Sequence, residues 1–493
     1  MAPRRSKRWP AARARALLAC IVALEATWGP IPMCVAAPQL LPLVRSPAVY
    51  QLDARVVTRE LTLRKGSPAT LNDLSDNDLD GFAEAGFDAV YLMGVWQTGD
   101  HGILSAQKQL LARRAEAAPK NTPPPAPPPA GDVVPLDTDT PEVAAAKAAA
   151  KAAAAAAAAE DGRLAKLQED GPGQAPLEAA VGSPTAIIDY SVHADLGGDA
   201  ALAELRERLH ERGLRVFLDF VSNHMAADHP WTITNPQYLV RGSPDDVARE
   251  PHNYYCVGEG AVAGIYAHGR DPYFDGWEDT VQLNYASDAL QEEMCEALAK
   301  VAGMCDGVRC EMAMLQCPSV FEQTWKQHLE GNGISCAGLA DADRLFWPRA
   351  VQAARRVKED FVLIAEVYWG REYELQGYGF DFTLDKVAYE QLRDLKTEEF
   401  RQHASNDNHQ FHLHSARFLE THSEKRASTV FTKSHEEAGT HQHLAAAVAC
   451  YTMPGMKMVC DGQLQGRKNQ EPLYLAWRDN SEQRDIFVSR HQF

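Results

Sequence analysis

Residues 306 to 315 read DGVRCEMAML, and this stretch combines the pattern of a buried strand with charged side chains. Val308 and Cys310 are apolar, as in a strand packed on both faces, yet Arg309 and Glu311 stand among them. A charged side chain is costly to bury unless an opposite charge and hydrogen bonds compensate it. We therefore interpret the stretch as a core strand that brings an arginine and a carboxylate to a functional site.

The same strand pattern recurs along the chain and alternates with helical stretches. Strand-like apolar runs occupy residues 49–57, 89–96, 215–221, 307–313, 361–368, 380–385, 416–421 and 456–461. Nearly continuous apolar strands that alternate with helices indicate a parallel sheet covered on both faces. This number of units favours a (β/α)8 barrel of the TIM type over an open, doubly wound sheet.

Polar side chains follow four of these strands where each apolar run ends. They are Asp219, Asn223 and His224, then Arg309 and Glu311, then Glu366, and finally His422. Active sites of such barrels collect at the carboxyl ends of the strands, so these side chains are expected to meet at one mouth. Each residue alone has a structural explanation, such as a loop cap or a counter-charge, but the joint pattern predicts an active site.

In order and spacing, these regions resemble those of the α-amylase superfamily of retaining α-glycosidases and transglycosidases. The matching residues are Asp219, Asn223 and His224 in DFVSNH for the D-x-x-x-N-H region, Gly307 and Arg309 in GVRCE for G-x-R-x-D, Glu366 in IAEVYW for the fifth-strand glutamate, and His422 in THS for N-H-D. Further similar stretches lie at 90–99, 189–199, 274–285 and 454–468. The resemblance extends over residues 49–103 and 182–470.

The resemblance implies action on α-glucosidic bonds, so an α-glucan of the starch or maltodextrin type, or a maltooligosaccharide, is the expected partner. In retaining enzymes one carboxylate attacks the sugar, and a second, about 5–5.5 Å away, protonates the leaving oxygen. Glu311 occupies the nucleophile position, Glu366 that of the general acid/base, and Ser423 that of a third carboxylate. The implied substrate-binding residues are Asp219, Tyr190, His224, Arg309 and His422.

Two of the three acid positions depart from the family pattern. Glu311 replaces an aspartate and is one methylene longer, and Ser423 carries no charge. Thr421 replaces the family's asparagine, and Thr185 falls where many members have a tyrosine on which the sugar stacks. A misplacement near 1 Å can cost on the order of 10²-fold in rate, and one lost electrostatic donor roughly 3–4 kcal/mol. We therefore expect weakened activity, with a non-catalytic descendant that binds a glucan or a protein partner as the alternative.

The chemistry requires no cofactor, and the composition excludes some classes of partner. The resemblance leaves calcium open, because Asn223 stands where many family members have a calcium ligand. The formal net charge of −18 argues against nucleic acid or an anionic membrane surface, because both need a basic footprint. The ten cysteines form no C-x-x-C pair, so neither a zinc site nor a thioredoxin-type motif is indicated, and buried thiols are expected.

The barrel is assigned to residues 49–103 and 183–470, with a short excursion at 222–285 after the third strand. Residues 104–182 contain a proline run and an alanine run with spaced lysines. Such a composition favours an extended or helical spacer, so we predict a low-complexity insertion outside the core. Residues 471–493 are expected to form a divergent tail, which leaves no room for the β-sandwich that usually follows the barrel in the family.

Residues 1–48 depart from the rest of the chain in charge and hydropathy. Six basic residues within the first fifteen precede the apolar run ALLACIVAL at 16–24. This order resembles a secretory or organelle-targeting leader, and a disordered basic tail is the alternative. The run is too short to span a bilayer, and no other segment is apolar enough to do so.

Overall fold

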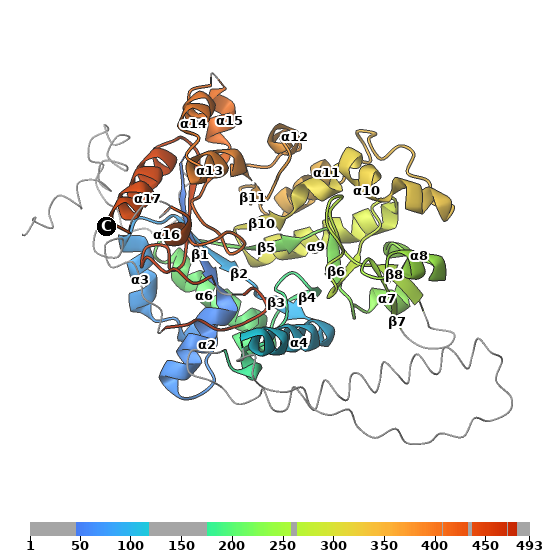
Figure 1. Ribbon diagram of the computed structural model, residues 1–493, viewed down its shortest axis with the longest axis horizontal. Coiled ribbons are helices and arrows are strands. Elements are labelled where there is room, and N and C mark those ends of the chain that lie inside the picture. The colour runs from blue at the N-terminus through green and yellow to red at the C-terminus, as the bar shows by residue number, and fades with distance from the viewer. Residues whose placement is uncertain are drawn as a thin grey trace, which may run out of the picture.

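The computed structural model describes residues 46–117, 175–257, 264–406, 408–431, 436–470 and 472–480. Within these segments eight parallel strands close into a barrel that helices surround (Figure 1). In hydrogen-bonding order the strands are β1 (Ala48–Asp53), β14 (Met456–Cys460), β13 (Ser415–Arg417), β12 (Phe382–Leu384), β11 (Val362–Ala365), β10 (Gly307–Glu311), β5 (Arg215–Val221) and β2 (Ala89–Met93). The predicted (β/α)8 barrel is confirmed, and each predicted run overlaps one barrel strand.

Helices cover the outside of the barrel. They are α2 (Ala54–Lys65), α3 (Asp76–Glu84), α4 (Asp100–Ala117), α6 (Gly198–His210), α9 (Asp288–Met304), α10 (Pro318–Gly331), α11 (Phe346–Val357), α12 (Glu372–Gly377), α13 (Lys386–Arg393), α14 (Thr397–Ala404), α15 (His409–Leu413), α16 (Ala427–Val430) and α17 (Glu436–Tyr451). Local sequence sets their ends. At the start of α2 the Asp53 side chain accepts the N–H groups of Arg55 and Val56, and Gly66 ends the helix with a φ of 71°.

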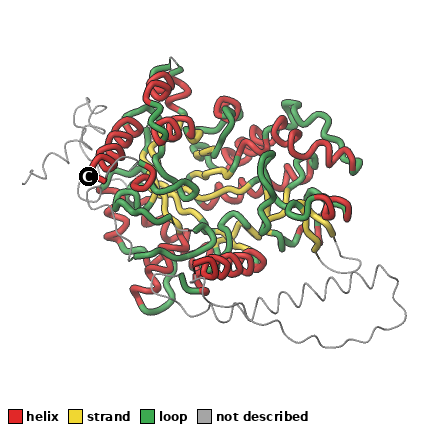
Figure 2. The backbone as a smooth tube through the Cα atoms, in the orientation of Figure 1, coloured by secondary structure: helices red, strands yellow, loops and turns green. Residues whose placement is uncertain are grey.

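The segment between β5 and α9 forms the excursion after the third barrel strand. It contains two antiparallel pairs, β6 (His224–Ala226) with β9 (Thr280–Gln282) and β7 (Tyr254–Val257) with β8 (Gly264–Ala267), and the short helices α7 (Trp231–Thr234) and α8 (Pro244–Arg249). These strands lie to one side of the barrel (Figure 2). A third antiparallel pair, β3 (Trp96–Thr98) with β4 (Ile187–Val192), comes between the second and third barrel strands.

Alternation along β10 decides which of its residues face the interior of the barrel. Val308 and Cys310 pack outward in the apolar cluster shared with the surrounding helices. Arg309 belongs to the opposite face of the strand and lies in register with Asp219 of β5. The inward-facing positions of other strands form a separate apolar cluster that includes Val49, Ala89, Tyr91, Phe217, Ile364 and Met458. The strand period therefore places Arg309 inside a largely apolar barrel.

The predicted boundaries of the spacer at 104–182 need correction. Helix α4 buries Ala106 and Leu110 against Ala175 and Leu475, and the Arg114 guanidinium donates a hydrogen bond to the carbonyl of Ala175. Alanine and leucine at helical spacing thus cover a small apolar surface, so the packed part of the chain continues past 103. Residues 118–174, which hold the proline and alanine runs, lie outside the described residues.

The predicted tail begins with residues that cross the barrel. Leu475 forms an antiparallel bridge with Ala180, and the N–H of Val181 donates to the carbonyl of Tyr474 at 3.0 Å. Arg478 lies 2.5 Å from Asp461, which directly follows β14. Residues 472–480 are therefore part of the folded barrel.

Two other expectations concern targeting and thiols. The predicted leader falls outside the described residues except for its last three positions. No helix in the described segments is long and apolar enough to cross a membrane. Cys310 and Cys460, which lie in apolar strand runs, are buried, as predicted.

Asp306, the first residue of the stretch DGVRCEMAML, joins three strands at their amino ends. Its carboxylate accepts the N–H of Val216 at 2.7 Å, lies 2.7 Å from Nε2 of His210 and pairs with Lys358. Its carbonyl accepts the N–H of Val362 at 3.1 Å. Burial alone would raise the pKa of Asp306, but the hydrogen bonds from His210 and Lys358 hold it well below its ordinary value.

We expect Asp306→Asn to lower the free energy of unfolding by about 3 kcal/mol at pH 7, because it leaves shielded cations without their counter-charge. A lowered pKa contributes stability above the unfolded-state pKa and loses it as the pH falls. The difference between wild type and variant should therefore shrink below a pH of about 4. Urea unfolding followed by circular dichroism at several pH values measures both effects. Equal stability of the two proteins at pH 7 would contradict the assignment.

Deleting residues 118–174 and joining the ends through a short glycine-rich linker should leave the melting temperature unchanged. The deleted stretch holds prolines and alanines without a periodic face of larger apolar residues. Deleting 104–182 should instead lower the melting temperature, because it removes the contacts of Leu110 and Arg114. Thermal denaturation of both variants tests this pair of expectations. Loss of soluble protein in the shorter deletion would rule out the spacer assignment.

Candidate active site

Arg309 is the centre of the candidate site. Its side chain lies inside the barrel and is 3% exposed, and its Nη2 atom lies 2.6 Å from Oε2 of Glu366, directly after β11. Asp219 adds a second negative charge from the neighbouring strand. Burial alone would lower the pKa of Arg309, but the charges of Glu366 and Asp219 raise it above its ordinary value. The guanidinium therefore stays charged.

Glu366 is held by three donors. Besides Arg309, the N–H of Met312 donates to Oε2 at 2.9 Å, and the hydroxyl of Tyr368 donates to Oε1 at 2.7 Å. Met312 directly follows Glu311 and has a φ of 44°, which is uncommon for a residue with a side chain. Burial alone would raise the pKa of Glu366, but Arg309 and these hydrogen bonds lower it below its ordinary value.

Glu311 is the last residue of β10, and its carboxylate lacks the three hydrogen-bond donors that stabilise the charge of Glu366. Burial raises the pKa of Glu311, the negative charge of Glu366 raises it further, and Arg309 offsets only part of the effect. Its Oε2 atom is shielded from solvent and has no hydrogen-bond partner among the described residues. As the pH falls, a proton therefore binds Glu311 before Glu366. Environments that push two carboxyl pKa values apart give the two groups different acid–base roles.

The carboxylate of Asp219, predicted to bind substrate, accepts hydrogen bonds from within the protein. Its carboxylate accepts the hydroxyl of Tyr91 and the N–H of Gly94, the latter at 2.7 Å. Its own carbonyl accepts the indole N–H of Trp96 at 2.8 Å. Burial raises the pKa of Asp219, and Arg309 opposes that rise. In this arrangement Asp219 supports Arg309 from the third barrel strand.

Tyr190, predicted to bind substrate, is buried and makes its hydrogen bonds within the protein. Its hydroxyl donates to the carbonyl of Val221 at 2.6 Å and accepts the N–H of the same residue at 3.1 Å. Its ring packs against those of Trp96 and Phe220, and the side chain is buried. Tyr190 thus anchors the end of β5 through the backbone of Val221.

His224 follows β5 into the excursion. Its ring centroid lies 5.0 Å from that of Trp277, and its Nδ1 atom lies 3.4 Å from the amide nitrogen of Asn223. Burial lowers the pKa of His224 to about 3. The imidazole is therefore neutral, with one donor and one acceptor nitrogen for hydrogen bonds to hydroxyl groups.

The surroundings of Asn223 do not fit a calcium ion. Calcium takes six to eight oxygen ligands, with carboxylates prominent among them. The Asn223 side-chain oxygen already accepts the amide of Gln282 at 3.1 Å and that of Gln316 at 3.5 Å. Across the described segments no group of three or more His, Cys, Asp or Glu side chains is arranged to hold a metal. We assign no role to calcium at this position.

His422 lies on the loop after β13, across the barrel from His224. Its Nδ1 atom is 2.9 Å from Nε2 of Gln51 in β1. Burial and the positive charge of Arg309 lower the pKa of His422 to about 3, so this imidazole is also neutral. Both histidines can therefore exchange hydrogen bonds with a neutral, hydroxyl-rich ligand.

The position expected for a third carboxylate holds no charge. The Ser423 hydroxyl lies 3.1 Å from that of Thr421. The next residue, Glu424, lines the same small cavity as Glu366, but Lys386 pairs with it. The carboxylate of Glu424 is therefore already compensated by a cation.

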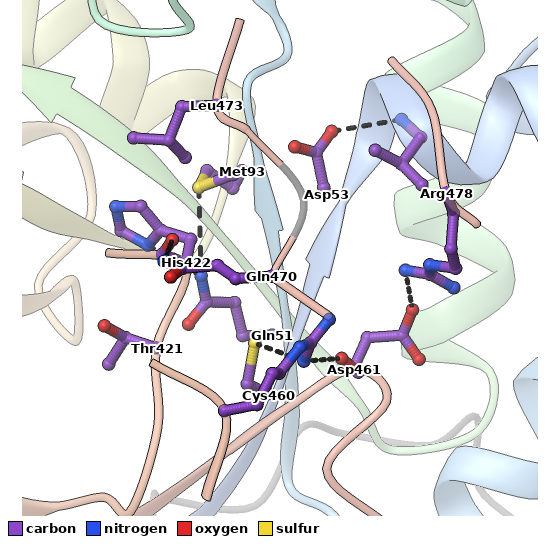
Figure 3. A pocket seen from close by; sticks show the side chains of 12 residues that line it. Gln51, Asp53, Met93, Thr421, His422, Cys460, Asp461, Gln470, Leu473 and Arg478 are labelled. Carbon is purple, nitrogen blue, oxygen red and sulfur yellow. Dashed lines mark hydrogen bonds and ion pairs between the residues drawn. The ribbon is translucent and has the colours of Figure 1, made fainter. Parts of the chain in front are cut away.

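Figure 3 shows the mouth of the barrel beside His422. Gln51 and Met93 line it from the first two strands, and Gln470 and Leu473 line it from the segment after β14. The Gln470 amide donates to the carbonyl of His422 at 2.9 Å. The cavity they enclose has a volume of about 40 Å³, which suits a few water molecules.

Several residues at this mouth were not predicted from the sequence. Gln51 and Tyr91 lie at inward-facing positions of β1 and β2, so the strand alternation that places Arg309 inside the barrel also predicts their orientation. Tyr368 is two residues past Glu366 on the same loop. For Gln470 and Leu473 no comparable signal exists, because their position depends on how the segment after β14 folds back.

Together these residues form a paired carboxylate site. Glu311 and Glu366 interact electrostatically with each other and with Arg309. The raised pKa of Glu311 favours its protonated form, and the lowered pKa of Glu366 favours its charged form. Such a pair can attack an electrophilic carbon with one oxygen and supply a proton to a leaving oxygen with the other group. Neutral hydrogen-bonding side chains around it suit a neutral substrate.

Comparison with known proteins gives matches to alpha-amylases. The model described as "Alpha amylase, catalytic domain" matches residues 186–491. Alpha-amylase MalA from Haloarcula japonica is 26% identical over 318 residues, which are 61% of this chain and 39% of that protein. Alpha-amylase 3 from Dictyoglomus thermophilum is 22% identical over 307 residues, 57% of this chain and 53% of that protein. The chain thus spans about half the length of these relatives, or less.

Solved structures of low sequence identity share the fold. The cyclic α-maltosyl-(1→6)-maltose hydrolase from Arthrobacter globiformis gives a TM-score of 0.54 at 14% identity, over 93% of this chain and 82% of that one. An α-amylase from Lactobacillus plantarum gives 0.51 at 17% identity, over 91% and 80%. Because the family model covers more than half of the residues, the chain belongs to the family of alpha-amylase catalytic domains.

Proposed function

We propose that the protein acts on α-glucosidic bonds of starch-type or maltodextrin-type glucans by a retaining mechanism, with weakened activity. Membership of the alpha-amylase family supports the substrate class, as do the names of the relatives. The observation that carries the proposal is the interaction of Glu311 with Glu366 around Arg309 at the ends of adjacent barrel strands. Two neutral histidines at the same mouth suit sugar hydroxyls.

In the proposed reaction Glu311 is the nucleophile and Glu366 the general acid. A carboxylate oxygen of Glu311 bonds to the anomeric carbon while the bond from that carbon to the glycosidic oxygen breaks, and Glu366 gives its proton to the departing oxygen. Water, or an acceptor sugar hydroxyl, then attacks the same carbon. Its proton passes to Glu366, and the bond to Glu311 breaks, which restores both groups.

The resting protonation pattern opposes this order of events. The reaction needs a charged Glu311 and a protonated Glu366, whereas Arg309 stabilises the charge on Glu366 and burial favours a proton on Glu311. Bringing the pair into the reactive state therefore costs free energy before the chemistry begins. The uncharged Ser423 removes a further source of transition-state stabilisation, worth roughly 3–4 kcal/mol for a comparable donor. Both features support weakened activity.

A second candidate function is binding without catalysis. The same protonation pattern and the compensated charge of Glu424 favour it, because both leave the site short of a reactive acid. The side chains of His224, His422 and Gln51 can form hydrogen bonds with a ligand whether or not a bond in it is cleaved. In this alternative the cleft retains an α-glucan or a protein partner and does not cleave it.

Initial rates on maltoheptaose test the proposed enzyme directly. Wild type should be slow, and Glu311→Asp and Ser423→Asp should each raise the rate in part, because they shorten the nucleophile and restore a carboxylate. The double variant should at least match the product of the two gains, since both changes act on one transition state. As a control, Glu366→Gln in the double-variant background should abolish activity.

Calorimetric titration with maltoheptaose separates the enzyme from the binding protein. The enzyme and a glucan-binding protein both predict sugar binding by wild type and weaker binding by His224→Ala, whereas only the enzyme releases reducing ends. A folded double variant that binds sugar and stays inert would favour the binding protein. A wild-type rate typical of enzymes would contradict the weakening. Absence of any sugar binding would contradict the enzyme and a glucan-binding protein, and would leave binding of a protein partner as the function.

A further inference from the structure

Gln51 connects the first barrel strand to the ring of His422. Its side chain is buried, and it lines both the cavity beside His422 and the small cavity that contains Glu366. The Nε2 atom of Gln51 lies 2.9 Å from Nδ1 of His422. Because β13, β14 and β1 are neighbours in the closed barrel, two residues that are 371 positions apart in the sequence meet at the mouth.

The contacts of the Gln51 amide decide which of its two ends faces His422. A carboxamide nitrogen only donates hydrogen bonds, and its oxygen only accepts them. The Nε2 atom of Gln51 also lies 3.8 Å from the sulfur of Met93, a weak acceptor without a proton to donate (Figure 3). An amide oxygen in the same place would gain nothing from that sulfur. The two contacts together therefore favour the nitrogen at this end of the amide.

The hydrogen bond from Gln51 fixes where the His422 ring carries its proton. Burial and the charge of Arg309 lower the pKa of His422 to about 3, so the ring is neutral and has one protonated nitrogen. Since Nδ1 accepts from the Gln51 amide, the proton is on Nε2. Within the described part of the chain the ring makes its hydrogen bond through Nδ1, which leaves Nε2–H for a ligand in the cavity that also holds Arg309 and Glu366.

We propose that Gln51 is a positioning residue that holds His422 in the Nε2–H tautomer, so that the ring offers a hydrogen-bond donor to a glucosyl hydroxyl beside Glu366. This inference rests on the proposed function and adds the residue that orients one of its sugar contacts. An imidazole that is free to rotate or to exchange tautomers must be ordered when the ligand binds, which lowers the affinity. Anchoring through Nδ1 removes that cost before the ligand arrives.

Nitrogen-15 NMR of histidine-labelled protein tests the tautomer, because protonated and unprotonated ring nitrogens have separate chemical shifts. In wild type, Nδ1 of His422 should have the unprotonated shift and Nε2 the protonated one, with His422→Gln assigning the signals. Gln51→Glu, measured above neutral pH, should place a proton on Nδ1, because a carboxylate can only accept. A protonated Nδ1 in wild type, or an unprotonated Nδ1 in Gln51→Glu, would overturn the proposal.

Gln470→Met is the matched control. The Gln470 amide donates to the backbone carbonyl of His422 at 2.9 Å and not to its ring, so this substitution should leave the tautomer as it is in wild type. A changed tautomer in Gln470→Met would overturn the control of the ring by Gln51, because the position of the loop would then decide it. Circular dichroism checks that each variant is folded.

Calorimetric titration with maltoheptaose tests whether Gln51 acts through His422. Gln51→Met keeps the length of the side chain but donates no hydrogen bond, and it should bind the sugar about fivefold more weakly than wild type. In a His422→Ala background the same substitution should have little effect, because the ring that Gln51 orients is gone.

The outcomes separate this inference from the proposed function. Equal losses of affinity on Gln51→Met in the wild-type and His422→Ala backgrounds would overturn the role through His422 and leave the proposed function standing. Failure of wild type to bind maltoheptaose would refute the glucan as ligand, and with it the sugar contact assigned to His422. A fivefold loss that disappears in the His422→Ala background, together with the predicted tautomers, would support both.

Discussion

One buried positive charge organises the carboxyl end of this barrel. Arg309 lies among inward-facing side chains, where little water is available to solvate it, so neighbouring strands must supply the compensating charge. Glu366 of the next strand pairs with it directly, and Asp219 of the preceding strand, held by Tyr91, completes the balance. The requirement to balance Arg309 therefore sets the protonation of the groups proposed to carry out the chemistry.

The fold was readable from the sequence because strand and helix periods are local properties. The run GVRCE shows the principle: apolar residues alternate with charged ones, so the strand and the inward direction of Arg309 follow together. The packing of α4 was missed, because alanine-rich helices carry a weak apolar signal and the proline run nearby dominated the composition. The path of residues 472–480 across the mouth depends on contacts distant in sequence, which no local pattern specifies.

The sequence predicted which residues lie at the candidate site, but it did not predict how their charges pair. Arg309, Glu311, Glu366, His224 and His422 follow the expected strands, and their roles remain predictions. The sequence placed Tyr190 among the ligand contacts, whereas burial and two backbone hydrogen bonds make it a support of β5. The resemblance implied that Arg309 binds substrate, yet its guanidinium pairs with Glu366 rather than Glu311. Which of two acids an arginine pairs with depends on side-chain geometry of about an ångström, which strand periodicity does not resolve.

The order in which the two glutamates bind protons tests this account most directly. Carbon-13 NMR of protein labelled at the glutamate side-chain carboxyl can follow each titration, with Glu311→Gln and Glu366→Gln assigning the resonances. The account predicts that, as the pH falls, the Glu311 carboxyl takes up its proton first and Glu366 only at lower pH. Protonation of Glu366 before Glu311 would contradict it, because Arg309 would then not hold the charge on Glu366, and the proposed cause of weakened activity would be absent.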